Sequence, residues 1–327
     1  MSIGAIGRLV VGALLSVSLL YGCAGESTAS LPSASVLQSL ASPPAGDPQA
    51  RVNLGKWIYT VQLYGEDLTI YRRHALTLTF DKTLTKGVSS PLGTKATPSG
   101  WWYVSNGGHS NVLVYRTTSR GPEGPVATLD DYGQIPSNVD VIPSRRVVAV
   151  SNYSTVGGGA GSVSIYLNRQ AEPSRTLTYG SDPLQGTGVA IDHQRNCYWS
   201  FNDPTTGNGS IVKFTNCSGK GTVVVPAIAS SAGLTFDQRD DLYYVDETVG
   251  IYKCRKTFDC HVLIGVSKHL GLPVSINFDQ KDKLLWVADA SGYIDAIDPT
   301  SGAIKYHKPA NGGPTDPPFG IAPAPGG

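Results

Sequence analysis

A short pattern of alternating apolar and polar residues recurs along the chain. Its clearest copy, residues 230–250, reads SSAGLTFDQRDDLYYVDETVG. The pattern predicts a strand over 233–236, a tight turn over 237–241, a second strand over 242–245 and a polar turn that begins at Asp246. Close copies occupy residues 273–292 and 186–207, and a looser copy occupies residues 136–159. One supersecondary unit repeated along a chain indicates a repeat fold.

Each copy contributes four predicted strands, of which the second is the easiest to align. Second strands are predicted at 57–62, 102–106, 148–152, 198–202, 243–246 and 285–289, and their last residues lie 43 to 50 residues apart. Third strands follow at 68–72, 111–116, 162–167, 210–215, 250–254 and 293–298. Fourth strands follow at 76–81, 126–130, 175–179, 222–225, 261–265 and 303–307. Four antiparallel strands repeated six times predict an all-β fold, the six-bladed β-propeller.

The C-terminal tail fits the same pattern. Residues 317–325 (PPFGIAPAP) align with the first-strand motifs GLTFD and SINFD, but no second strand follows them. The first blade, in turn, lacks a clear first strand before Trp57. We therefore predict that the tail pairs with the N-terminal blade and closes the ring, which leaves no sheet edge exposed there.

The blades read strand, Asp-turn, strand ending in Asp or Asn, hairpin and strand. In this they resemble the group of NHL, gluconolactonase-like (regucalcin-type) and YncE-like propellers. The resemblance covers about residues 51–327 and implies the fold rather than one activity. WD40 repeats are disfavoured, because no copy carries their Gly-His to Trp-Asp signature.

Four cysteines besides Cys23 form an even set, which in an oxidising compartment predicts two disulfides. In the fourth blade, the second and third strands pair about a centre near residue 207, which places Cys197 opposite Cys217. In the fifth blade, Cys254 ends the third strand and Cys260 begins the fourth. Of the three pairings that four cysteines allow, the hairpins favour Cys197–Cys217 with Cys254–Cys260. A zinc site would need close CxxC pairs, and the sequence has none.

Residues 1–22 have the pattern of an export signal. Arg8 is their only charge, and the apolar run 9–20 that follows is too short to span a membrane. The run leads into LYGC (residues 20–23), which resembles the lipobox of bacterial lipoprotein precursors and implies cleavage before Cys23 and its lipidation. The alternative is an ordinary secretory signal with an incidental cysteine. Residue 24 is Ala rather than the Asp of inner-membrane retention signals, so we expect a lipid-anchored protein of the bacterial cell envelope, with the outer membrane favoured.

Residues 23–50 are rich in Ser, Ala and Pro and indicate a flexible tether that leads to the propeller at 51–327. Removing residues 1–22 takes away one basic residue and no acidic residue, which leaves 25 of each. A neutral chain gives no electrostatic reason to bind nucleic acid. We expect a monomer with no nucleic-acid partner, held to the membrane by the lipid on Cys23.

Polar residues close the predicted second strands and are the first candidates for a functional site. Because equivalent strand ends fall on one face of a propeller, we expect them to surround the mouth of its central channel. Carboxylate, amide and imidazole groups in such a ring could hold Ca²⁺ or a small polar ligand. The alternative is turn chemistry, in which Asn and Asp side chains bond the nearby backbone. The set comprises the strand-end residues Asn106, Asn152, Asn202, Asp246 and Asp289 together with their neighbours His109, Tyr153, Asp203 and Glu247.

A second set of equivalent positions lies in the first strands, at the channel mouth. Gluconolactonase-like enzymes place Asn and Asp ligands for a divalent metal in such motifs, so the resemblance makes Asn138 and the nearby Asp140 candidate metal ligands. The other copies carry Gly or Ser there, which departs from the family pattern (Gly188, Gly233, Ser275 and Gly320). A divalent cation such as Ca²⁺ is the one cofactor that the sequence suggests.

No catalytic signature is present: the sequence contains no GxSxG, HExxH, EF-hand loop or P-loop. We therefore interpret the chain as a non-catalytic envelope propeller that presents one face to an envelope protein or a small polar ligand. The alternative is a metal-dependent hydrolase or lactonase resembling the gluconolactonase group and acting through the Asn/Asp ring. A lyase of the virginiamycin-inactivating propeller type is a further alternative, but it implies seven blades and a His/Glu pair.

Overall fold

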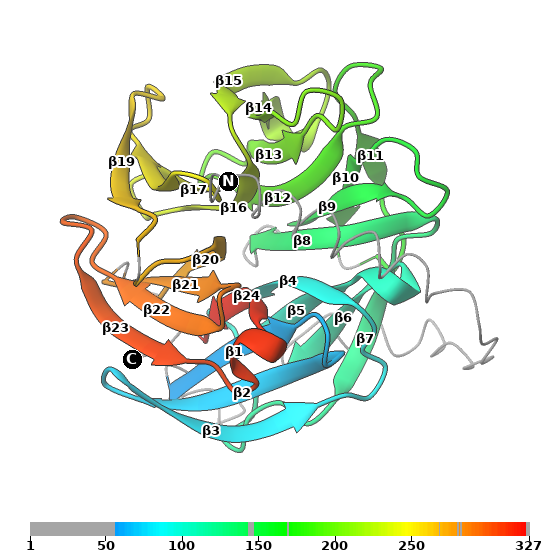
Figure 1. The fold of residues 1–327 in the computed structure, drawn as a ribbon. Helices are drawn as coiled ribbons and strands as arrows, with labels where there is room; N and C mark the ends of the chain where they lie inside the picture. The colour runs from blue at the N-terminus through cyan, green and yellow to red at the C-terminus, as the bar shows by residue number, and fades with distance from the viewer. Residues whose placement is uncertain are drawn as a thin grey trace.

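The computed structural model describes residues 56–142, 147–168, 170–267, 269–279, 281 and 283–324. The predicted export signal, the lipidation site Cys23 and the tether 23–50 lie outside the described residues. Within the described chain, 24 strands form six four-stranded antiparallel sheets, and the sheets are arranged in a ring (Figure 1). The prediction of a six-bladed propeller is confirmed.

The blades follow one another along the chain, and each is numbered here from the N-terminus. From the axis outward, the strands of blade 1 are β24 (Pro318–Pro323), β1 (Trp57–Gln62), β2 (Asp67–His74) and β3 (Thr77–Leu84). The strands of blade 2 are β4 (Pro91–Ala96), β5 (Trp101–Asn106), β6 (Asn111–Arg116) and β7 (Pro125–Asp130). The strands of blade 3 are β8 (Gln134–Ile142), β9 (Val147–Thr155), β10 (Ser162–Leu167) and β11 (Arg175–Leu177). The strands of blade 4 are β12 (Gln185–Ile191), β13 (Cys197–Asn202), β14 (Gly209–Phe214) and β15 (Thr222–Ile228). The strands of blade 5 are β16 (Ser231–Phe236), β17 (Leu242–Asp246), β18 (Gly250–Cys254) and β19 (Cys260–Gly265). The strands of blade 6 are β20 (Pro273–Phe278), β21 (Leu285–Asp289), β22 (Tyr293–Ile297) and β23 (Ile304–Pro309).

The chain closes the ring with its C-terminal strand. β24 lies beside β1 and pairs with it antiparallel, with Tyr59 opposite Ala322 and Val61 opposite Gly320 (Figure 1). This is the closure that the tail sequence predicts. The one innermost strand that the repeat pattern does not predict is β4, because the Pro and Gly of PLGTKA interrupt its alternation.

Large aromatic side chains of the second strands fill the wedges between neighbouring blades. Trp102, Trp199 and Trp286 are fully buried. Trp102 packs between Tyr59 of blade 1 and Tyr115 of its own blade, with ring centroids 4.4 and 4.7 Å away. Burying one such side chain contributes about 2–3 kcal/mol. Blade-to-blade packing of this kind therefore holds the ring together.

Both predicted disulfides are confirmed. Cys197 is bonded to Cys217 and Cys254 to Cys260. Each links neighbouring elements of one blade, so the bonds stabilise blades 4 and 5 locally. On a chain-entropy basis, closing loops this short contributes about 2–3 kcal/mol each.

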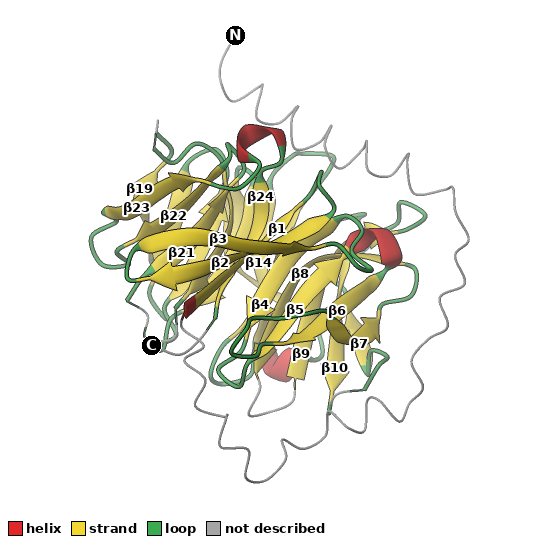
Figure 2. Cartoon of the chain, turned by 90° about the horizontal axis from the view of Figure 1, so that it is seen from below, coloured by secondary structure: helices red, strands yellow, loops and turns green. Residues whose placement is uncertain are grey.

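The antiparallel pairing places two kinds of strand end on one face of the ring. Each innermost strand begins where the second strand of its blade ends: Ser231 pairs with Asp246, and Pro273 with Asp289. We call this side the front face. The strands run between it and the opposite face (Figure 2). Among the described residues, no helix is long and apolar enough to cross a membrane.

Candidate functional site at the axis of the propeller

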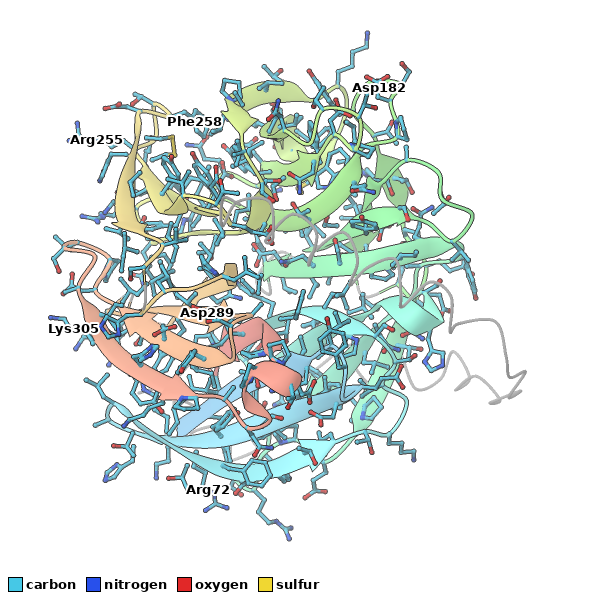
Figure 3. The ribbon with its side chains drawn as sticks, in the orientation of Figure 1. Arg72, Asp182, Arg255, Phe258, Asp289 and Lys305 are labelled. Carbon is cyan, nitrogen blue, oxygen red and sulfur yellow. A yellow bond between two sulfur atoms is a disulfide. The ribbon has the colours of Figure 1, made fainter. Side chains whose placement is uncertain are left out.

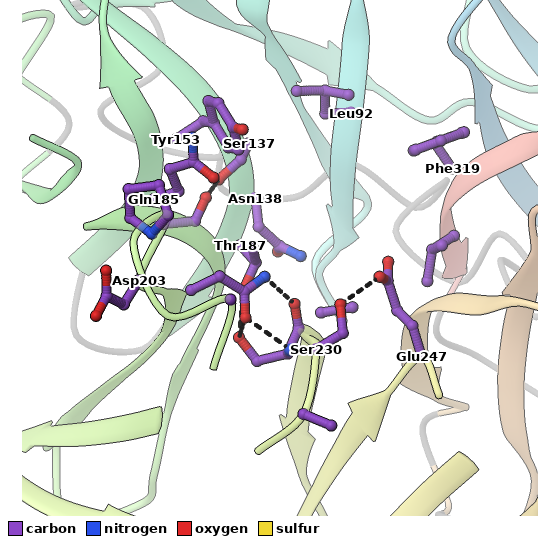
Figure 4. Close-up of a pocket in the computed structure, with 18 residues that line it drawn as sticks. Leu92, Ser137, Asn138, Tyr153, Gln185, Thr187, Asp203, Ser230, Glu247 and Phe319 are labelled. Carbon is purple, nitrogen blue, oxygen red and sulfur yellow. Dashed lines mark hydrogen bonds between the residues drawn. The ribbon is translucent and has the colours of Figure 1, made fainter. Parts of the chain in front are cut away.

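A pocket of about 360 Å³ opens on the front face, at the axis of the ring (Figure 4). Every innermost strand contributes at least one residue to its lining, so the pocket is formed by the closed ring and belongs to no single blade. Six of these residues, one from each strand, occupy equivalent positions: Leu92, Ser137, Thr187, Ala232, Val274 and Phe319.

The residues that follow these six lie where the innermost strands come close to one another. They are small at most positions because the innermost strands approach one another closely there. A Cβ on Gly93 would lie 2.6 Å from the Cα of Asn138, and one on Gly233 would lie 2.9 Å from the Cα of Ser275. Contacts that close exclude a side chain without a shift of backbone. The Gly and Ser residues that depart from the lactonase pattern therefore have a packing role, and Asn138 is the one member that lines the pocket.

Two residues further along the strands, three polar side chains cross the axis. We call Lys95, Asp140 and Asn277 the axial plug. The Lys95 Nζ lies 3.0 Å from Oδ1 of Asp140 and donates to Oδ1 of Asn277 at 2.9 Å. The Asn277 amide donates to the carbonyls of Thr94 and Ile321, and the Ile191 N–H donates to Oδ2 of Asp140 at 2.7 Å. The plug thus ties five of the six innermost strands together.

The plug changes the interpretation of the candidate metal ligands Asn138 and Asp140. Both oxygens of Asp140 already accept a hydrogen bond, one from an ammonium and one from a backbone N–H. Asn138 remains at the base of the pocket, one level closer to the front face. Among the described residues, no group of three or more His, Cys, Asp and Glu side chains has a metal-binding arrangement.

The pocket has an apolar side and a polar side. Leu92 of blade 2, Val274 of blade 6 and Phe319 of blade 1 form the apolar side, and Figure 4 shows Leu92 and Phe319 across the space from Gln185, Thr187 and Asp203. Blades 3, 4 and 5 supply the polar side. Its side chains are Ser137, Asn138, Tyr153, Gln185, Thr187, Asn202, Asp203, Ser230, Ser231 and Glu247.

Glu247 is the residue with the most unusual environment on the polar side. It follows the last residue of β17, and its own N–H donates to the Ser230 carbonyl at 2.9 Å. The Ser230 hydroxyl donates to its Oε2 at 2.7 Å. Burial raises the pKa of Glu247 to about 7, against the opposing effect of the Ser230 hydrogen bond, and the neighbouring Asp246 carboxylate raises it further. The carboxyl group therefore changes charge near neutral pH.

Asp203, the other carboxyl of the lining, is in the opposite situation. Its Oδ1 accepts the Thr205 N–H at 2.8 Å and its Oδ2 accepts the Thr206 hydroxyl at 3.0 Å. These hydrogen bonds lower the pKa of Asp203, so the group is ionised at neutral pH. Tyr153 is partly buried, and this burial raises its pKa, so its hydroxyl stays protonated.

Four of the nine predicted ring residues line the pocket: Tyr153, Asn202, Asp203 and Glu247. Asn202 also has a structural task, because its Oδ1 accepts the N–H of Ser231 at 2.8 Å and its amide donates to the Ser231 carbonyl at 3.1 Å. It therefore links blade 4 to the first residue of β16 in blade 5.

The other five ring residues do not line the pocket and bond to their own blade. Asn106 accepts the Ser89 N–H at 2.6 Å, Asp246 accepts the Ala229 N–H at 3.0 Å, and Asp289 accepts the N–H groups of Gly271 and Leu272 at 2.7 and 2.9 Å. These donors lie in the loops that lead into the innermost strands, so the acceptors fix those loops. The Asn152 amide donates to the hydroxyls of Ser162 and Ser164, and the His109 Nδ1 lies 3.3 Å from the Asn106 amide nitrogen.

The sequence prediction missed the apolar side of the pocket altogether. Leu92, Val274 and Phe319 lie one residue before the first-strand positions, in the motifs PLG, PVS and PFG. Aligning the six first strands and examining the preceding column would have identified them. Gln185, Thr187 and Ser230 were missed for a similar reason, because the prediction considered the ends of the second strands and only one column of the first strands.

Comparison with known proteins supports the fold and gives no family. No family model and no curated protein sequence matches the chain. Among solved structures, the hydrazine synthase of Kuenenia stuttgartiensis matches with a TM-score of 0.54 and 14% identity over 79% of each chain. A streptogramin B lyase structure matches with a TM-score of 0.48 and 14% identity, over 67% of this chain and 68% of its own. At this identity the likeness to the hydrazine synthase shows the propeller fold alone, and the weaker likeness to the lyase carries no argument.

Proposed function

We propose that the protein binds a small organic molecule in the axial pocket, and that the ligand has an apolar part and a polar part. The observation that carries this proposal is that, among the described residues, blades 6, 1 and 2 contribute only apolar side chains to the lining, whereas all of its polar side chains come from blades 3, 4 and 5. A pocket with an apolar wall and a few convergent polar groups is the usual form of a small-molecule site.

The size of the pocket limits the ligand. A volume of about 360 Å³ is at the lower end of the range for drug-sized ligands, roughly 300–1,000 Å³. A folded protein segment is too large for this space. We therefore place a small molecule in the pocket and keep protein partners for other surfaces.

The lactonase alternative receives no support from the residues named for it. Asp140 is engaged by Lys95 and by the Ile191 backbone, and the positions equivalent to Asn138 are occupied by Gly or Ser. We do not carry that alternative forward.

A cavity-filling variant tests the binding proposal. Ala229 lines the pocket and uses only its backbone N–H, toward Asp246. In Ala229→Trp an indole would occupy ligand space, so fragments that bind the wild type should lose about tenfold or more in affinity. Ala303→Trp, at an exposed loop position outside the pocket lining, is the matched control and should bind as the wild type does. Ligand-observed NMR with a library of small aromatic alcohols, amides and amines measures both. Equal binding to the wild type and Ala229→Trp, or no binding by any fragment, contradicts the proposal.

We also propose that a lipid on Cys23 holds the propeller in the bacterial envelope, on the strength of the LYGC motif and the tether that follows. Expression of the full chain and of Cys23→Ser in a bacterial host tests this. The wild type should sediment with membranes and gain the mass of a diacylglyceryl cysteine, and the variant should do neither. Identical mature masses and a soluble wild type would contradict the anchor.

A further inference from the structure

The charges of the pocket lining are all of one sign. Its residues include two carboxyl groups, Asp203 and Glu247, and within the described chain no Lys, Arg or His lines it. The labelled Arg72, Arg255 and Lys305 lie toward the outer edge of the ring (Figure 3). A phosphate or carboxylate ligand would find no cationic partner in the pocket and would be repelled by its carboxylates.

The two carboxyl groups differ in what they have left to offer a ligand. Both oxygens of Asp203 accept hydrogen bonds from its own turn. Glu247 uses Oε2 to accept from Ser230, and the described residues supply no hydrogen-bond partner for its Oε1. Glu247 therefore keeps one free acceptor, and its carboxyl group points into the open space of the pocket (Figure 4).

The apolar side of the pocket provides the second half of a recognition site. Leu92 and Phe319 border the space across from Gln185, Thr187 and Asp203, with Phe319 on the same side as Glu247, and Val274 completes the apolar wall (Figure 4). A ligand that bridges the two sides would place an apolar body against these side chains and one charged group near Glu247. Such an arrangement removes apolar surface from water and pairs the carboxylate at the same time.

Resting on the function proposed above, we infer that the ligand is an organic monocation, an aryl- or alkylammonium, whose ammonium group pairs with the Glu247 carboxylate and whose apolar body packs on Phe319, Leu92 and Val274. The ammonium donates to Oε1, the free oxygen. Ser230 holds the other oxygen and so fixes the orientation of the carboxylate. Gln185, Thr187 and Tyr153 also line the pocket, but the Thr187 hydroxyl lies 3.1 Å from the hydroxyls of Ser200 and Ser231, and Tyr153 is hydrogen-bonded to Gln185.

Binding of a cation to this site must be linked to the protonation of Glu247. The ammonium favours the ionised carboxylate, so binding lowers the pKa of Glu247 from its unliganded value of about 7 and releases a proton below that pH. An alkylammonium has a pKa of about 10 and stays charged throughout. The affinity should therefore fall by about tenfold for each pH unit below about 6.5 and level off above about 8.

Few other titratable groups can disturb this linkage. Asp246 is adjacent to Glu247 in the chain and raises its pKa. Across the cavity lie Asp203, which is ionised, and Tyr153, which is protonated. Lys95 lies two residues beyond Gly93 on β4, where Asp140 and Asn277 engage it. Because the pKa of Asp203 is lowered and that of Tyr153 is raised, neither of these two groups changes its charge with pH in the way that the inference assigns to Glu247.

Three probes with one aromatic body test the charge preference: 4-phenylbutylamine, 4-phenylbutanol and 4-phenylbutyrate. Isothermal titration of the purified protein at pH 8 should show binding of the amine at least about tenfold tighter than of the alcohol, and no binding of the carboxylate. The amine affinity should fall toward pH 6, while the alcohol affinity should stay level.

Glu247→Gln separates the charge from the shape of the site. The amide keeps the volume of the side chain and an oxygen for the Ser230 hydroxyl, so the variant should fold and bind the alcohol as the wild type does. Its amine affinity should fall about tenfold or more and lose its pH dependence. Glu123→Gln makes the same change at an exposed position outside the lining and should leave all three affinities unaltered.

The outcomes distinguish a failure of the cation inference from a failure of the proposed binding function. An alcohol that binds as tightly as the amine, or an amine affinity that is unchanged in Glu247→Gln, overturns the cation inference and leaves the pocket as a binding site. Failure of all three probes to bind overturns the cation inference, and failure of the fragment library together with them overturns the proposed function as well.

Discussion

Two levels lie along the axis of the propeller, the axial plug and the pocket, and the innermost strands contribute to both. They differ in whether their polar groups have partners within the protein. At the axial plug, the ammonium of Lys95, both oxygens of Asp140 and the whole amide of Asn277 have partners within the protein. At the pocket, one oxygen of Glu247 faces open space. A charge taken out of water is tolerated when the fold supplies its partner. The plug therefore serves stability, while the pocket leaves a partner to be supplied by a ligand.

The largest effect should come from removing the strand that both levels share. β24 supplies Phe319 to the pocket and the Ile321 carbonyl to Asn277, and it closes the ring against β1. Deleting residues 317–327 should abolish the cooperative melt or lower the melting temperature by more than about 10 °C. Circular dichroism measures this, and deleting only residues 325–327 is the control. An unchanged melting temperature for the longer deletion would contradict closure of the ring by β24.

The next largest effect should separate the plug from the pocket. Lys95→Met leaves the buried Asp140 carboxylate without its counter-charge and should destabilise the protein by about 2–4 kcal/mol in urea unfolding. The double variant Lys95→Met/Asp140→Asn removes both charges and should recover part of that loss.

Ligand binding gives the second readout for the plug. The plug residues do not line the pocket, so the double variant should bind the aromatic alcohol with the wild-type affinity once folded. A double variant that is less stable than Lys95→Met, or that has lost binding, would show that the two levels are not separate.

The smallest of the three effects is a dependence of stability on pH that identifies the buried carboxyl groups. Burial raises the pKa of Asp131 to about 6, of Glu247 to about 7 and of Asp295 to about 8, where Asp289 adds to the effect. In the unfolded chain these groups ionise near pH 4. The folded state therefore binds more protons than the unfolded state between about pH 4 and 8, and these groups stabilise the protein at low pH and lose that contribution as pH rises.

Glu247→Gln isolates the contribution of the pocket to this trend. The difference in unfolding free energy between wild type and variant should shift by about 1–3 kcal/mol in favour of the variant between pH 5 and pH 8. Glu123→Gln should show no such shift. A constant difference for Glu247→Gln would mean that its carboxyl group is not buried as described.

The repeat in the sequence was sufficient to predict the fold, because the repeated pattern reflects which strands pair with one another. The spacing of the second strands predicted six blades, PPFGIAPAP predicted the closing strand, and the hairpin around residue 207 predicted the Cys197–Cys217 bond. Each of these three predictions depends only on strands that are neighbours in the sequence or on one column of the aligned repeats. The pattern failed only where it was interrupted, as in PLGTKA of β4.

The candidate site was less accessible to sequence reasoning, because strand ends of the same type have different roles. Asp246 and Asp289 look like ligands in the sequence, yet each accepts backbone N–H groups of a loop. Glu247, one residue later, faces the pocket. Which of two adjacent acidic side chains turns inward depends on the path of the loop, and the apolar wall depends on three strands, β4, β20 and β24, that meet only in the closed ring. Neither is encoded in a local motif.

The most direct measurement is a crystal structure of the protein soaked with 4-phenylbutylamine at pH 8. We predict density in the axial pocket, with the ammonium within hydrogen-bond distance of the Glu247 Oε1 and the phenyl ring against Phe319. Density for the amine at another place on the molecule, with the axial pocket holding only water, would contradict it.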